Sequence, residues 1–146
     1  DGEVRATGHR QDGRPWSVAV ETPDAAAVAR HSLLALEDMA VATSGDYRHF
    51  VTVGDTRLSH TMDPLRGAPL VSAPASVSVL SASCMLADAM ATALMVKGEA
   101  RGLAFAQAHK ISALFLQRSS KGMIANGTGA FATTVDEELV SDPPGL

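Results

Sequence analysis

The residues whose types and spacing could do chemistry begin with Asp88, which lies in the middle of an apolar, alanine-rich stretch. Aspartate is a poor residue for a helix interior, because its short side chain competes for backbone hydrogen bonds. Thr92 follows four positions later, so in a helix the two side chains share a face, roughly 5–6 Å apart at Cβ. A carboxylate with a hydroxyl suits Mg²⁺ or Ca²⁺, which prefer oxygen ligands. An exposed Asp88 that is hydrogen-bonded to Thr92 fits the same spacing, and both interpretations stay open.

His60 is the second candidate, because it ends an alternating segment and precedes a proline- and glycine-rich stretch at residues 63–75. Irregular connections of that length are often functional. Imidazole exchanges a proton near neutral pH, so His60 could act as a base; a surface histidine is the alternative. The remaining histidines have no partners at metal-ligand spacing: His9, His31, His49 and His109.

A third candidate is the segment Thr43-Ser44-Gly45-Asp46-Tyr47, which combines small side chains, a glycine and one aromatic ring. A ligand can approach the backbone closely at such a glycine, and exposed amides suit phosphate or ribose. An ordinary turn is the alternative interpretation of the same segment.

Composition restricts the class of protein. The chain has 146 residues, with 12 Lys+Arg against 16 Asp+Glu, which is one domain with a mildly acidic balance. Scattered basic residues in an acidic chain argue against nucleic-acid binding. Cys84 is the single cysteine, so no internal disulfide can form. No apolar run approaches the roughly 18–20 residues that span a bilayer.

In the C-terminal half, alternation predicts a strand at residues 76–81, directly before a helix with Ser83 as N-cap and Gly98 after its end. A second helix at residues 99–109 is expected to pack Leu103 and Ala106 inward. A strand at 112–117, a polar turn region at 119–129 and an unstructured tail at 141–146 follow. The first helix is expected to bury an apolar stripe made of Met85, Leu86, Ala89, Met90, Ala93 and Leu94.

The N-terminal half predicts mainly strands. Residues 4–6 and 16–20 alternate around a Gly/Pro-bearing loop and are expected to pair as a hairpin. Residues 25–36 fit either a short helix or a strand, and we favour a strand from Leu33. A turn is expected at 44–46, and a second hairpin at residues 48–61 around Gly54-Asp55. Strand runs followed by a helical pair indicate an α+β fold with a mainly antiparallel sheet over residues 1–140.

Four stretches, in order, resemble the ApbE family of flavin transferases. The first is similar to the family's Gly-Gly-Asp/Glu strand, with Asp1 in place of the first glycine. The others are similar to its Ala-Thr-Ser-Gly-Asp-Tyr block, its Ser-His-x-x-Asp-Pro loop, and a strand followed by an Ala-Asp-x-x-x-Thr metal helix. In this sequence they are residues 2–8, 41–48, 59–69 and 76–94. One departure is Arg66, which stands before Gly67 where the family usually has a threonine.

The resemblance implies the C-terminal portion of a T-fold-like flavin transferase, which moves FMN from FAD onto a threonine of a target protein and releases AMP. Asp88 and Thr92 would then bind Mg²⁺, together with the Ala91 carbonyl. His60 would lie near the pyrophosphate, as a base or as a stabiliser of the phosphates. The flavin nucleotide would contact the Met62 backbone and four residues of the third candidate segment: Thr43, Ser44, Gly45 and Asp46.

The resemblance also implies partners. Family members are longer, so we expect an N-terminal half, FAD, an acceptor protein, and a periplasmic or membrane-associated location. An Mg²⁺-dependent FAD pyrophosphatase and a non-catalytic flavin-binding fragment are the alternatives. We expect the chain alone to leave a sheet edge unpaired, to self-associate, to bind FAD weakly and to show no transferase activity.

Overall fold

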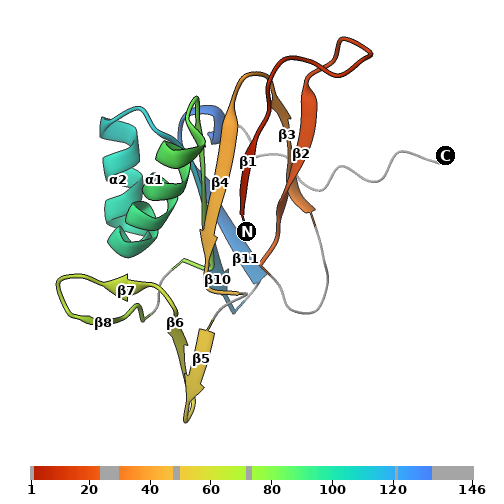
Figure 1. The fold of residues 1–146 in the computed structure, drawn as a ribbon. Helices are drawn as coiled ribbons and strands as arrows, with labels where there is room; N and C mark the ends of the chain where they lie inside the picture. Colours follow the sequence, from red (N-terminus) through yellow and green to blue (C-terminus); the bar gives the residue numbers. More distant parts are fainter. Residues whose placement is uncertain (1, 24–29, 48–49, 72–73, 121, 133–146) are drawn as a thin grey trace.

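A computed structural model describes residues 2–23, 30–47, 50–71, 74–120 and 122–132. The centre of the protein is a five-stranded antiparallel sheet in the order β1-β4-β9-β10-β11. Helices α1 and α2 cover one face of this sheet, and the β2–β3 hairpin lies against the other face (Figure 1). The fold is therefore α+β, as expected. The sheet strands are β1 Glu3–Arg5, β4 Ala40–Gly45, β9 Ser76–Ser81, β10 Ser112–Ser119 and β11 Gly122–Gly127.

Alternation along the strands sends neighbouring side chains to opposite faces of the sheet. In β9, Val77 and Val79 pack against the helices, whereas Leu80 packs on the hairpin side. In β10, Phe115 faces the helices, and Leu114 faces the hairpin with Val20. The sheet consequently has a buried cluster on each face, which fixes the register of its central strands.

Helix α1, Cys84–Lys97, begins and ends as predicted. The Ser83 side chain accepts a hydrogen bond from the Leu86 N–H at 3.4 Å, and Gly98 ends the helix with a φ of 73°. The predicted apolar stripe is confirmed for Leu94, which is buried, and for Met90, which packs against the core. It is wrong for its other members, since Met85 is 81% exposed and Leu86, Ala89 and Ala93 are exposed as well. In an alanine-rich helix nearly every face is apolar, and the face that meets the sheet consists of Ala87, Ala91, Leu94 and Met95.

The next two elements also match the expectation. Helix α2 spans Glu99–Ala108, with Ala106 buried and Leu103 packed against the same cluster, and β10 follows. The expected polar turn region at 119–129 is wrong, since β11 pairs with β10 along its whole length. Met123 and Ala125 of β11 pack on the hairpin side, so this strand has a half-buried pattern despite its polar composition. A short 3-10 helix, Gly129–Phe131, closes the described part.

The expected first hairpin is wrong. β1 pairs with β4, and β2 (Trp16–Glu21) pairs with β3 (Arg30–Leu36) on the other face. Alternation in residues 4–6 and 16–20 identified both strands correctly, but it does not specify the partner of either. The strand favoured from Leu33 is confirmed and begins three residues earlier, while the helical alternative for 25–29 lies outside the described residues. The expected turn at 44–46 is wrong for Ser44 and Gly45, which belong to β4.

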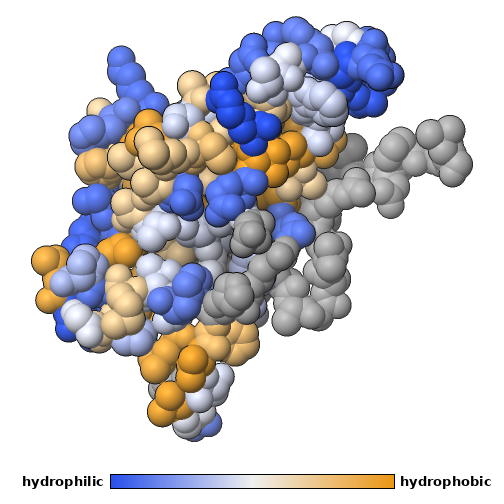
Figure 2. Space-filling view, in the orientation of Figure 1, coloured by the Kyte–Doolittle hydropathy of each residue, from blue (hydrophilic) through white to orange (hydrophobic). Residues whose placement is uncertain are grey.

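Two small hairpins project from one end of the sheet. The predicted hairpin around Gly54-Asp55 is confirmed over residues 50–59, with β5 (Phe50–Val53) paired to β6 (Thr56–Ser59), while residues 48–49 lie outside the described part. Figure 2 shows hydrophobic side chains gathered on it at the bottom of the view. The connection that was expected to be irregular contains a second short pair, β7 (Met62–Asp63) with β8 (Ala68–Pro69).

The expected tail at 141–146 lies outside the described residues. No described helix is long and apolar enough to cross a bilayer.

Candidate functional site

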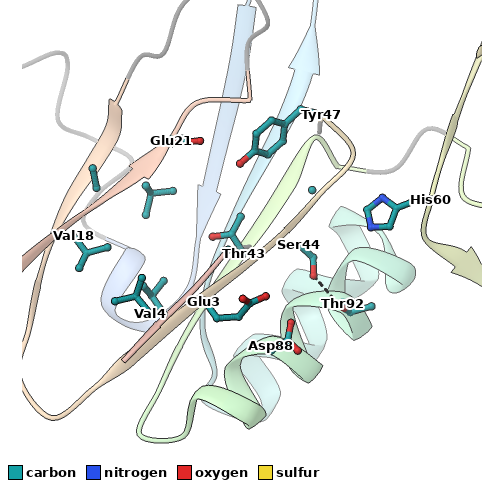
Figure 3. A pocket seen from close by; sticks show the side chains of 15 residues that line it. Glu3, Val4, Val18, Glu21, Thr43, Ser44, Tyr47, His60, Asp88 and Thr92 are labelled. Carbon is teal, nitrogen blue, oxygen red and sulfur yellow. Dashed lines mark hydrogen bonds between the residues drawn. The ribbon is translucent and has the colours of Figure 1, made fainter. Parts of the chain in front are cut away.

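A pocket of about 450 Å³ lies where the start of β1 leaves the end of β4 uncovered. Residues of β1, β2, β4 and α1 line it, and His60 reaches it from the end of β6 (Figure 3). It therefore collects side chains from segments that are far apart in the sequence. Its lining consists of Gly2, Glu3, Val4, Val18, Ala19, Val20, Glu21, Val41, Thr43, Ser44, Gly45, Tyr47, His60, Asp88 and Thr92.

The end of β4 divides the pocket into two sides. Thr43 faces the hairpin side, where its hydroxyl lies 2.7 Å from the Ser78 hydroxyl. Ser44 faces the helices, and its hydroxyl lies 2.8 Å from that of Thr92. β1 approaches closely here, since the Thr43 N–H donates to the Gly2 carbonyl at 2.9 Å, and a Cβ at position 2 would lie 2.5 Å from the Thr43 oxygen. Only glycine fits that approach.

On the helix side, α1 presents two polar residues, Asp88 and Thr92, to the pocket. Asp88 and Thr92 are exposed and one helical turn apart, on the edge of the helix beside the buried face. Ser44 from the sheet joins Thr92, and the Glu3 carboxylate lies on the same side (Figure 3). The alternative interpretation agrees with the structure in that Asp88 is exposed at the helix edge, while the partner found for the Thr92 hydroxyl is Ser44.

His60 is held by the residues on either side of it. Ser59 is buried, and its hydroxyl accepts from the Thr61 N–H at 3.1 Å, while the Thr61 carbonyl accepts from the Leu70 N–H at 2.9 Å. His60 itself is exposed and lines the pocket together with Asp88. The structure thus brings residues of all three candidates from the sequence into one site.

Three other expected site residues lie outside the pocket lining. Met62 is half-exposed in β7, Ala91 is fully buried in the interior of α1, and the Asp46 carboxylate bonds to Arg118. The Ala91 carbonyl lies within the helix, where backbone carbonyls accept hydrogen bonds from the following turn. Ligand contacts of these three residues therefore stay predictions.

The hairpin side of the pocket was not foreseen. Val18, Val20 and Val41 provide apolar walls, and Glu21 and Tyr47 provide polar groups at the rim. The Tyr47 ring stands at one end of the pocket with its hydroxyl directed inward (Figure 3). The one available signal was Tyr47 in the third candidate segment, since nothing in the composition of β2 points to a ligand.

The helix side of the pocket supplies oxygen atoms of the kind that a divalent cation binds. Within the described residues, no group of three or more His, Cys, Asp or Glu side chains is placed to hold a metal. The helix side offers one carboxylate of α1, two hydroxyls and the nearby Glu3, all oxygen ligands. Mg²⁺ commonly binds through one or two carboxylates while keeping waters and substrate phosphates. The residues therefore fit Mg²⁺ and do not fit zinc, which takes four close N, S or O ligands in structural sites.

Comparison with known proteins decides the family. The family model of the ApbE family matches residues 1–115, which is most of the chain. This chain belongs to the ApbE family. It is 40% identical over 130 residues to the FAD:protein FMN transferase of Vibrio cholerae, covering 89% of this chain and 39% of that protein. The FAD:protein FMN transferase of Haemophilus influenzae is 34% identical over 131 residues, covering 89% of this chain and 38% of that protein.

Solved structures of the ApbE family share the fold. The flavinyl transferase ApbE of Pseudomonas stutzeri superimposes with a TM-score of 0.78 at 39% identity, covering 94% of this chain and 42% of that one. The ApbE protein of Thermotoga maritima gives 0.76 at 27% identity, covering 93% of this chain and 43% of that one. The chain thus spans about two fifths of the length of the ApbE proteins it matches.

Proposed function

We propose that this chain carries the metal and phosphate side of an FAD:protein FMN transferase. The supporting observation is the helix side of the pocket, where Asp88, Thr92 and Ser44 meet opposite His60. Membership of the ApbE family, whose matched relatives are named as such transferases, supports the substrate class.

In the proposed reaction, the hydroxyl oxygen of an acceptor threonine attacks the phosphorus of the FMN half of FAD. A phosphoester bond forms, the bond to the bridging oxygen breaks, and AMP leaves with that oxygen. Such phosphoryl transfers depend mainly on positioning and on stabilisation of charge. A bound Mg²⁺ would neutralise charge on the phosphoryl oxygens.

The chain's own residues would orient this reaction. Asp88 and Thr92 would hold the cation at the edge of α1, and the Ser44 hydroxyl would keep the Thr92 side chain oriented through their 2.8 Å contact. His60 would take the proton from the incoming hydroxyl. The apolar hairpin side, with Val18 and Val41, would receive part of the flavin nucleotide.

The test is a flavinylation assay on the protein that contains this chain, with FAD, MgCl₂ and a family acceptor domain bearing its threonine. We expect a covalent FMN adduct on the acceptor and an equal amount of AMP, both abolished by EDTA. A matched acceptor with alanine in place of that threonine should stay unmodified. Free FMN and AMP without any adduct would contradict the transferase and favour a pyrophosphatase, and bound FAD without turnover would favour a binding fragment.

A further inference from the structure

A bidentate ion pair lies just behind the pocket and is absent from its lining. Arg118, near the end of β10, donates from Nη1 to Asp46 Oδ2 at 2.9 Å and from Nη2 to Asp46 Oδ1 at 2.7 Å. The Asp46 side chain is 12% exposed and the Arg118 side chain is 39% exposed. The two residues are 72 positions apart in the sequence. Two parallel charge-assisted bonds of this kind fix geometry as well as adding stability.

The backbone reinforces the same corner of the molecule. The Asp46 N–H donates to the Ala75 carbonyl at 3.1 Å, and the Ala75 N–H donates to the Leu116 carbonyl at 2.7 Å. Asp46 is therefore tied through its backbone to the segment before β9, and through its side chain to β10. The residue that follows β4 is therefore held by β10 and by the residue that precedes β9.

Asp46 lies between residues that do line the pocket. Ser44 and Gly45 precede it, and Tyr47 follows it. The Tyr47 ring lies directly on Gly45, since a Cβ at position 45 would be 2.7 Å from its Cε1 atom and 3.1 Å from the Ala75 oxygen. A rotation of the backbone at Asp46 would thus move the Tyr47 ring relative to the strand end that carries Ser44 and Gly45.

We propose that Arg118 is a positioning residue of the pocket, which through Asp46 holds Tyr47 and the end of β4 in the orientation that binds the flavin nucleotide. Arg118 does not touch the ligand in this proposal. The binding part of the proposal rests on the function proposed above, whereas the orientation of Tyr47 does not depend on any ligand.

The first experiment measures FAD binding by flavin fluorescence in the protein that contains this chain. Arg118→Met should raise the Kd for FAD about tenfold, and Arg118→Lys, which keeps the charge but loses the bidentate geometry, should raise it less. Asp46→Asn, which weakens the same pair from the other side, should also raise the Kd for FAD.

A matched control is available in the Asp12–Arg14 pair. Arg14 donates to Asp12 Oδ2 from Nη2 at 2.7 Å and from Nε at 3.0 Å. These hydrogen bonds hold the pKa of Asp12 below its ordinary value. This pair joins residues two positions apart on an exposed loop outside the pocket lining. Arg14→Met should leave the Kd for FAD unchanged within about twofold, well below the tenfold effect expected at Arg118.

The second experiment needs no ligand. Tyr47 is the single tyrosine of this sequence, and its ring NMR signals in the ring-labelled protein that contains this chain are assigned as those that disappear in Tyr47→Phe. Arg118→Met and Arg118→Lys should shift or broaden these signals, whereas Arg14→Met should not. If Arg118→Met fails to fold, Arg118→Lys and Asp46→Asn provide the same comparison.

The outcomes separate the two proposals. Unchanged Tyr47 signals together with an unchanged Kd in folded Arg118 variants would overturn the positioning role, even if their thermal midpoints fall. A wild-type protein that does not bind FAD would overturn the proposed function, and the Tyr47 signals would then still decide whether Arg118 sets the pocket wall. Shifted Tyr47 signals together with a raised Kd for FAD would support both the positioning role of Arg118 and the proposed function.

Discussion

Helix α1 has two adjoining sides with opposite roles. One side consists of Ala87, Ala91, Leu94 and Met95, all fully buried against the sheet. The other side carries Asp88 and Thr92, which directly follow Ala87 and Ala91 in the sequence. Both are exposed at the pocket. A step of one residue turns an α-helix by about 100°, which is enough to move a side chain from core to site.

The difference between the two sides shows how stability and chemistry are kept apart in one element. The buried side uses small residues that let α1 approach the sheet, and its apolar contacts stabilise the fold. The pocket side carries polar groups in a solvent-accessible position, where an ionised carboxylate has no large desolvation cost. Substitutions on the two sides should therefore affect different measurements.

The largest expected effect is on the pocket side. Asp88→Asn keeps the side-chain volume but removes the charge that would attract Mg²⁺. We expect flavinylation activity at limiting Mg²⁺ to fall by more than about 100-fold, since even residues that only support metal ligands are worth 10- to 100-fold. The thermal midpoint should change little, because Asp88 is exposed. Asp55→Asn, on the exposed β5–β6 turn, is the matched control, and an active Asp88→Asn protein at low Mg²⁺ would refute the metal assignment.

The next effect is on the buried side. Leu94→Ala removes a fully buried side chain from the cluster between α1 and the sheet. We expect the free energy of unfolding to fall by about 2–5 kcal/mol, measured by denaturant titration. Leu65→Ala, at a 93% exposed side chain, should change it by less than about 0.5 kcal/mol. If Leu94→Ala lowered the Mg²⁺ affinity of the folded protein as much as Asp88→Asn, the separation of the two sides would be wrong.

A smaller effect is expected at Thr92. Thr92→Val removes the hydroxyl that contacts Ser44 and would reach the cation. We expect half-maximal activity to need about tenfold more Mg²⁺, because a neutral oxygen contributes less than a carboxylate. Thr92→Ser, which keeps the hydroxyl, should restore most of the affinity. A Thr92→Val protein that required more Mg²⁺ than Asp88→Asn would reverse the two roles.

The smallest effect is expected on the solvent side of α1. Met85 is 81% exposed, so Met85→Lys should change the free energy of unfolding by less than about 0.5 kcal/mol and leave activity unchanged. Denaturant titration and the flavinylation assay test this. A loss above about 2 kcal/mol would mean that this side of the helix is covered in the folded protein.

Local signals predicted the elements that carry the candidate site. Ser83 and Gly98 located both ends of α1, and alternation located β9 at its observed bounds. Capping and strand alternation depend on residues within one or two turns or a few positions, so a single sequence contains them. The i, i+4 spacing likewise predicted that Asp88 and Thr92 share a face.

The pairing and packing of segments that are distant in the sequence could not be predicted from such local signals. The alternating pattern of β1 fits pairing with β2 as well as with β4. In the structure β2 pairs with β3 on the other face of the sheet, and β1 pairs with β4. The buried side of α1 is another case, because its alanine-rich sequence offers several apolar faces and the contact with Val77 and Phe115 selects one.

By itself, the sequence determined the limits of α1 and β9, the second hairpin, the α+β class and the shared helix face of Asp88 and Thr92, because each follows from local geometry and composition. The tertiary structure alone decided that Ser44 meets Thr92, that His60 reaches the same pocket, and that Arg118 holds Asp46. These contacts join residues tens of positions apart, and such pairs are set by the packing of whole strands and helices, which no local pattern encodes.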